Sequence, residues 1–150
     1  MQLLTPSATS KAPADRFTGD VWVDMLPRGA PPSRVRAGVV RFAPGAHTAS
    51  HRHLTGQTLH ILDGRGLVQA RGGEVIEVGP GDTIDTPPGE WHWHGVAPDH
   101  FMTHFALSLD PADDQPGPGD RVGRPPQRRR VPRPLSSTQQ PPNRTRRRQP

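Results

Sequence analysis

Residues 45–64 read GAHTASHRHLTGQTLHILDG, and residues 81–94 read GDTIDTPPGEWHWH. Both segments begin at a glycine and mix apolar with polar residues over short runs that end in turn-forming residues, a pattern typical of short strands. Side chains at positions i and i+2 of a strand share one face, about 7 Å apart at their Cα atoms. His51 and His53 are therefore predicted to point together into the interior of a β structure.

A third ligand from a different hairpin is needed to complete a metal site around this pair. His92 follows a proline-glycine turn that can place it opposite, and Gln57 supplies an amide oxygen. The chain has no cysteine, so a metal site in it must use nitrogen and oxygen ligands. Three imidazoles and a carbonyl oxygen suit divalent Mn, Fe, Ni, Cu or Zn, and spacing does not separate these metals. We therefore predict one divalent ion held by His51, His53, Gln57 and His92.

Short apolar alternations continue on both sides of the two quoted segments, and glycine, proline and aspartate pairs separate them. No segment shows a 3.6-residue apolar stripe over three turns, so the predicted fold class is all-β. The pairs Asp63-Gly64 and Gly72-Gly73 each join two alternating runs and are predicted to be two-residue hairpin loops. The predicted strands are 21–26, 35–42, 47–53, 57–62, 66–71, 75–78, 82–86, 91–95 and 101–108.

Composition divides the chain into three parts: a flexible N-terminal arm over 1–20, a barrel over 21–109 and a tail over 110–150. Residues 1–109 carry 9 Lys/Arg against 10 Asp/Glu, whereas residues 110–150 carry 10 Arg against 4 Asp. The last segment also holds 10 prolines and almost nothing apolar, so it is predicted to be disordered. The strongly basic character of the whole chain therefore belongs to the tail.

The same patterns limit the partners that we expect. No apolar run approaches the ~20 residues of a membrane span, and the first residues lack the apolar core of a signal peptide. We therefore expect a cytoplasmic protein with no membrane partner. The arginine triplets at 128–130 and 146–148 have no aromatic residue among them, so nucleic acid is not an expected partner.

The two quoted segments resemble the two sequence motifs of the cupin superfamily, G-x5-H-x-H-x3–4-E-x6-G and G-x5-P-x-G-x2-H-x3-N. The resemblance implies a small double-sheet jelly-roll barrel. Two positions depart from the motifs: Gln57 stands where the family usually has Glu, and Val96 stands where the second motif ends in Asn.

Residues 38–107 are also similar to a narrower group of small bacterial cupins with a His-His-Gln-His site. The group includes manganese-dependent hydroxynitrile lyases and cupins associated with carboxymuconolactone decarboxylases. This similarity implies manganese as the first choice of metal, and the pairing of small cupin barrels implies a homodimer. The segments that carry the similarity are 56–58, 66–69, 92–95 and 102–104.

The glutamine changes the chemistry that we expect. A carboxylate ligand would leave a divalent site at net +1, whereas Gln57 with three neutral imidazoles leaves the full +2. Such an ion is a stronger Lewis acid, attracts small anions and stabilises a trivalent state less well. The ligand set thus favours polar, non-oxidative chemistry over redox cycling.

Two further histidines are candidates for acid/base catalysis. His94 lies two residues after His92 and so on the same face, and the resembled lyases have a pocket residue at this position. Strand parity puts His104 on one face with Met102 and Ala106, and the resemblance turns that face inward. Each of the two histidines could instead be a packed structural residue satisfied by the backbone.

The substrate pocket is predicted on the strand before the first motif. Gly38, Val40 and Phe42 share parity there, and the resemblance places Thr48 close to the ion. Their small or apolar surfaces would accommodate a compact small-molecule substrate, whether aromatic or not.

The leading hypothesis is therefore a metal-dependent, non-oxidative lyase of the hydroxynitrile type, with the ion as Lewis acid and His104 or His94 as acid/base. A metal-dependent dioxygenase acting on a small phenol or enol is the second reading. A non-catalytic cupin that binds a small ligand through its metal is the third.

Overall fold

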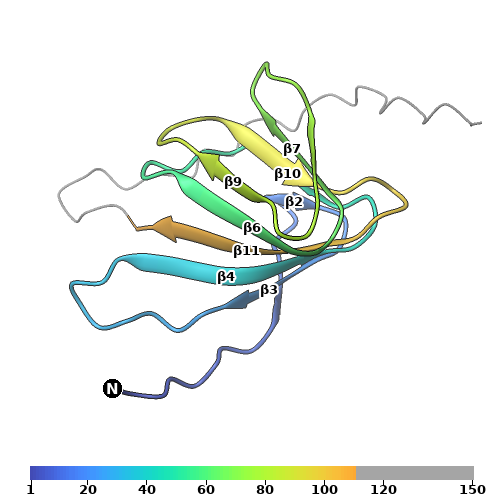
Figure 1. Cartoon of the computed structure of the whole chain (residues 1–150). Coiled ribbons are helices and arrows are strands. Elements are labelled where there is room, and N and C mark those ends of the chain that lie inside the picture. Colours follow the sequence, from blue (N-terminus) through green and yellow to red (C-terminus); the bar gives the residue numbers. More distant parts are fainter. Residues whose placement is uncertain (111–150) are drawn as a thin grey trace, which may run out of the picture.

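The computed structural model describes residues 1–110, which form two antiparallel sheets packed face to face, with no helix in that range (Figure 1). The all-β double-sheet prediction is confirmed. The six-stranded sheet has the order β1 (Ser10–Lys11), β3 (Val21–Met25), β4 (Val35–Phe42), β11 (Met102–Leu109), β6 (Gln57–Gly64) and β9 (Thr83–Thr86). The five-stranded sheet has the order β2 (Phe17–Thr18), β5 (His47–Thr48), β10 (His92–Gly95), β7 (Gly66–Ala70) and β8 (Ile76–Val78).

The core lies between the two sheets and follows the two-residue period of the strands. On β6, Leu59 and Ile61 are buried while His60 between them is exposed. Phe42 and Met102 join them from β4 and β11, at 2% and 0% exposure. Full burial of each such side chain is worth about 1.5–3 kcal/mol, so the apolar face fixes the strand register.

Strand β11 runs through the middle of the six-stranded sheet, between β4 and β6. His104 on it lies opposite Val40 of β4 and Ile61 of β6. Met102, His104 and Ala106 share one face, as parity predicted, and that face points inward, as the resemblance implied, because all three belong to the core or to the cavity described below. The centre of this sheet therefore carries one histidine among apolar neighbours.

The predicted strand over 47–53 is wrong in its second half. Strand β5 ends at Thr48, and His51 makes only an isolated bridge with His92, in which each N–H donates to the other's carbonyl at 2.9 Å. His53 lies beyond any strand, and Gly56 then turns the chain at φ +79° into β6 of the other sheet. The local pattern is strand-like, but the chain must leave one sheet for the other within these residues.

The two predicted hairpin loops have different outcomes. Asp63-Gly64 does not close a hairpin, because β6 and β7 belong to different sheets. Gly64 has φ +79° there, and a Cβ on it would lie 2.1 Å from the Phe101 carbonyl oxygen, so only glycine fits this crossing. Gly72-Gly73 does lie in a hairpin, between β7 and β8, although its loop is longer than two residues.

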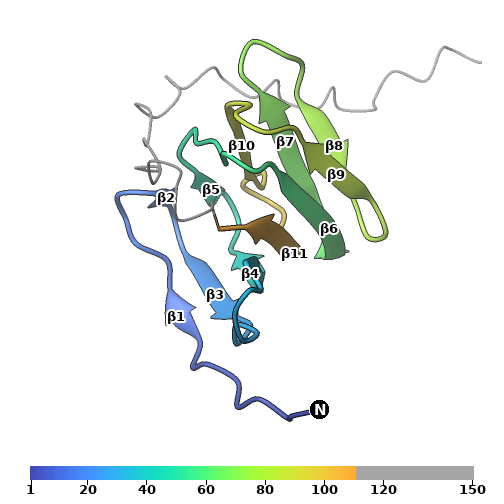
Figure 2. The ribbon, with the colours of Figure 1, turned by 90° about the vertical axis from the view of Figure 1, so that its left-hand side faces the viewer.

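The barrel begins closer to the N-terminus than predicted. Within the expected arm, β1 pairs with β3 in one sheet and β2 pairs with β5 in the other (Figure 2). Phe17 packs against the buried core, which a flexible arm would not do. Residues 111–150, which make up most of the predicted tail, lie outside the described part of the chain. In residues 1–110 there is no helix long and apolar enough to cross a membrane.

Candidate metal centre

Three histidines from two separate parts of the chain converge at one end of the barrel. His51 comes from the bridge to β10, His53 from the turn that leads into β6, and His92 from the first position of β10. Their ring centroids lie 4.3 Å apart for His51 and His92 and 5.2 Å apart for His51 and His53. One nitrogen from each ring lies within 4.8 Å of the others, which is the spacing of ligands around one ion.

Gln57 brings its amide to the same point. It is the first residue of β6 and is 9% exposed, and its Oε1 lies 3.1 Å from Nε2 of His92. The structure therefore places all four predicted ligands together. His51 makes an isolated bridge and His53 lies outside any strand, so the two do not meet as alternating residues of one regular strand.

Backbone carbonyls orient two of these rings. Nδ1 of His51 lies 2.9 Å from the Ala49 carbonyl oxygen, and Nδ1 of His92 lies 3.1 Å from that of Glu90. When Nδ1 donates its proton to the carbonyl, Nε2 keeps its lone pair for a metal. Nε2 of His92 and Oε1 of Gln57 then face each other as two acceptors, an arrangement that a shared cation satisfies. The donor set fits a divalent metal ion.

Burial sets the protonation state of the same rings. Burial and then the neighbouring His92 lower the pKa of His51 to about 3, and burial also lowers the pKa of His92. Both imidazoles are therefore neutral at neutral pH. Neutral imidazole is the form that binds a metal.

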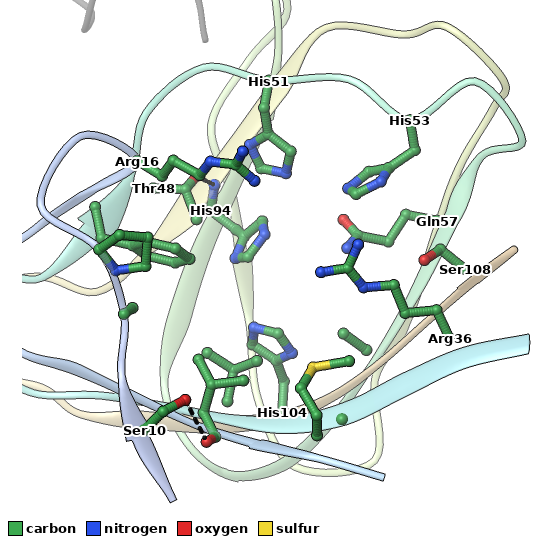
Figure 3. A pocket seen from close by; sticks show the side chains of 18 of the residues that line it. Ser10, Arg16, Arg36, Thr48, His51, His53, Gln57, His94, His104 and Ser108 are labelled. Carbon is green, nitrogen blue, oxygen red and sulfur yellow. Dashed lines mark hydrogen bonds between the residues drawn. The ribbon is translucent and has the colours of Figure 1, made fainter. Parts of the chain in front are cut away.

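A cavity of about 340 Å³ lies beside these ligands. His51, His53 and Gln57 line one end of it, His104 lines the other end, and His94 lies between them (Figure 3). The volume suits a small organic molecule.

His94 and His104 are the two candidate acid/base residues, and both line this cavity. They are 4% and 0% exposed, with ring centroids 5.0 Å apart. Burial lowers the pKa of His104 to about 4, and burial followed by the charge of His104 lowers that of His94 well below its ordinary value. Within residues 1–110, neither ring nitrogen of His104 has a hydrogen-bond partner, nor does Nδ1 of His94. Such groups cost about 1–3 kcal/mol each when unsatisfied, so they point to a ligand in the cavity.

Three of the four residues predicted for the substrate pocket line this cavity, and one does not. Gly38, Val40 and Thr48 line the cavity, and Thr48 Oγ1 accepts a hydrogen bond from the His94 amide at 3.1 Å. Phe42 does not line it. Its ring packs against those of His94 and His104 at centroid distances of 5.6 and 5.5 Å, because its end of β4 lies in the core.

The sequence analysis missed Arg36, Ser108 and Arg16, which also line the cavity. Arg36 shares strand parity with Gly38 and Val40, so parity could have found it. Arg16 comes from the N-terminal segment that was expected to be an arm, and no local pattern marked it.

The remaining histidines in the described range lie away from the metal ligands. His47 packs against Trp93, His60 is exposed and bonds Thr83, and His100 pairs with Asp99 at the surface.

Comparison with known proteins identifies the family. Residues 38–104 match the family described as the cupin domain. Over 100 residues the chain is 49% identical to (R)-mandelonitrile lyase from Granulicella tundricola, a match that covers 67% of this chain and 76% of that protein. The chain belongs to the cupin family. Its fold matches that of a cupin-like protein from Thermotoga maritima with a TM-score of 0.64 and 36% identity, covering 73% of this cupin and 81% of the other chain.

A shorter match links this cupin to a gentisate 1,2-dioxygenase from a Ralstonia species. The two are 38% identical over 58 residues, which covers 39% of this cupin and 16% of the dioxygenase. The resemblance inferred from the two motifs is thus confirmed: the chain is a cupin, and it is similar to a mandelonitrile lyase.

Proposed function

We propose that this cupin is a metal-dependent lyase that splits a small hydroxynitrile into an aldehyde and hydrogen cyanide, with manganese as the first choice of metal. The observation that carries the proposal is the position of His104, a buried neutral imidazole across one cavity from a neutral set of four metal ligands. The identity to (R)-mandelonitrile lyase supports the same reading.

The reaction needs a group that removes the hydroxyl proton and returns it to the leaving cyanide. A pKa of about 4 keeps the His104 ring neutral at working pH, so it can accept that proton. As the C–C bond breaks, its electron pair leaves with cyanide and the C–O bond becomes a carbonyl. Protonated His104 is then a strong acid and gives its proton to cyanide, which leaves as hydrogen cyanide.

A base with so low a pKa is weak, so the hydroxyl must be made more acidic before it gives up its proton. A divalent ion held by His51, His53, Gln57 and His92 would act as a Lewis acid on the substrate oxygen and so lower the pKa of the hydroxyl. His94, between the ligands and His104, shapes the wall along which the substrate lies. The Thr48 hydroxyl fixes the backbone of His94.

Cyanide release from mandelonitrile by manganese-loaded protein tests the proposal. We expect release by the wild type and a loss of at least about 100-fold in the His104→Ala variant, because general acid–base catalysis contributes roughly 10²–10⁴-fold. Elemental analysis should find equal metal in both proteins, since His104 is not a ligand. His60→Ala, which alters an exposed histidine on the outer face, should behave as wild type. Absence of release from the loaded wild type between pH 4 and 7 would refute the proposal.

The dioxygenase match favours a second candidate, oxidation of a small phenol or enol. Neutral Gln57 counts against it, because a ligand set without a carboxylate stabilises the oxidised metal less. Oxygen consumption with gentisate, measured in an oxygen electrode on iron-loaded protein, separates the two functions.

A further inference from the structure

Arg36 stands in one row with the metal centre. On β4 it has the same parity as Gly38 and Val40, and it lies opposite Ser108 of β11. Ser108 in turn lies opposite Gln57 of β6, so the row across the sheet is Arg36, Ser108, Gln57. Two strand spacings of about 4.8 Å separate the outer members, which puts the Arg36 backbone roughly 10 Å from that of a metal ligand. Figure 3 shows the Arg36 guanidinium reaching into the cavity on the side of Gln57.

Within the described part of the chain, this arginine has no counter-ion, unlike two of its neighbours. Arg41, on the opposite face of the same strand, pairs with Asp24 at 2.6 Å, and Arg28 pairs with Asp110 at 2.5 Å. Among residues 1–110, Arg36 has neither an ion pair nor a hydrogen bond. Its guanidinium, with five donors in a planar fork, therefore faces the cavity with its hydrogen-bonding capacity unused.

The other charged residues in the described cavity wall are also basic. Lys11, which pairs with Asp20 at 2.7 Å, and Arg16 line it as well, and none of its described lining residues is an aspartate or glutamate. The ligands Gln57 and three neutral imidazoles leave a bound divalent ion at its full charge. A cavity with the Arg36 guanidinium on its wall, a divalent ion beside it and no acid among its described lining residues would concentrate anions.

We propose that the substrate carries a carboxylate, which Arg36 binds on the cavity wall while the reacting carbonyl or hydroxyl carbon lies between the metal ligands and His104. The proposal rests on the proposed function for the reacting end and adds the substrate class: small hydroxynitriles, or their aldehydes, that bear an acid group at the far end. A guanidinium binds a carboxylate through two parallel N–H···O bonds, which a neutral amide of the same size cannot reproduce.

Matched ligands test this without relying on turnover. The dissociation constants of 3- and 4-formylbenzoate and of the corresponding formylbenzamides are measured by calorimetry on manganese-loaded protein. We expect the wild type to bind at least one acid roughly tenfold more tightly than its amide, the effect of a charge-assisted hydrogen bond. Arg36→Gln should bring that ratio close to one, and Arg36→Lys should keep part of it.

Arg41→Gln is the control, because it removes the same charge from the same strand on the outer face; its acid-to-amide ratio should equal that of the wild type. A ratio near one in the wild type would overturn the proposal, as would a ratio that Arg36→Gln leaves unchanged, since the metal would then be the anion site. Cyanide release from mandelonitrile is measured on the same preparations. If the protein prefers the acids but releases no cyanide, the carboxylate site stands and the lyase function is refuted. If it releases cyanide but does not prefer the acids, the lyase function stands and the carboxylate site is refuted.

Discussion

Gln57 sets the charge that the metal centre presents to a substrate, because it is the one ligand position where the cupin motif usually has a carboxylate. Its Oε1 lies 3.1 Å from Nε2 of His92, so a carboxylate oxygen would occupy the same place. We predict that Gln57→Glu holds manganese at least as tightly as the wild type but releases cyanide about tenfold more slowly, because the added negative charge weakens the Lewis acid. Elemental analysis and initial rates on the same preparation measure the two effects.

Gln57→Ala is the companion variant, since it removes the ligand and should lower metal content as well as rate. A Gln57→Glu protein that keeps the wild-type rate would show that the net charge of the ligand set does not control the chemistry.

His104 links the cavity to acid stability. Its pKa is about 4 in the folded chain, below the ordinary value of 6.5 that it regains on unfolding, so the unfolded chain binds the proton first as pH falls. The contribution of neutral His104 to the free energy of unfolding is therefore fully present above pH 6.5 and is lost as the pH falls from 6.5 to 4. Between pH 8 and 4.5 we predict that metal-free wild type loses about 2–3 kcal/mol more free energy of unfolding than His104→Gln.

Urea denaturation of the two proteins at several pH values measures this difference. His51, whose pKa does not depend on His104, titrates in both proteins and cancels in the comparison, whereas His94 contacts His104 and contributes to the difference. Parallel stability curves would mean that His104 does not titrate with folding.

At the scale of the strand, β10 carries His92 and His94 and owes its position to the glycine at its end. A Cβ on Gly95 would lie 2.4 Å from the His47 Cβ and 2.6 Å from the Ala46 carbonyl oxygen, so β5 and β10 pack more closely here than any side chain permits. We predict that Gly95→Ala lowers the free energy of unfolding by about 1–3 kcal/mol, as overpacking does, and reduces metal content. Thermal unfolding and elemental analysis are the measurements.

Gly79→Ala is the matched control, because a Cβ there meets nothing within 4 Å and the residue does not need a positive φ. It should leave both quantities unchanged. Equal effects of the two substitutions would show that the close approach at Gly95 does not position β10.

Strands were predictable wherever apolar and polar residues alternate over several positions, because one side of the strand then faces the core throughout. The strand over 35–42 has the same bounds in the structure, because its alternation continues from end to end. The segment over 47–53 looks similar, but it crosses from one sheet to the other, and a local pattern carries no information about which sheet a residue joins. The two-residue strands β1 and β2 were missed because neither is long enough to show a period.

At the scale of the whole molecule, the net charge of the barrel does not predict the charge that lines its cavity. Residues 1–109 are nearly neutral in sum, yet the cavity inside them is lined by cations and by no acid among the described residues. The motif spacing predicted that the four candidate ligands lie together, because those positions are close in sequence or fixed by a turn. The cavity wall draws on β1, β2, β4 and β11 together, and only the assembled sheets bring Arg36 into line with Gln57.

The metal should also stabilise the whole barrel, because its ligands come from both sides of the fold and meet only when the chain is folded. His53 and Gln57 enter with β6 of one sheet, and His92 enters with β10 of the other, so an ion ties the two sheets together. Binding to the folded chain alone adds about 4 kcal/mol when free metal is 1,000 times its dissociation constant. We predict that chelation lowers the melting temperature by several degrees, that manganese restores it, and that His51→Ala responds to neither treatment. A melting temperature that the chelator leaves unchanged in metal-loaded wild type would show that the four side chains do not hold an ion between the sheets.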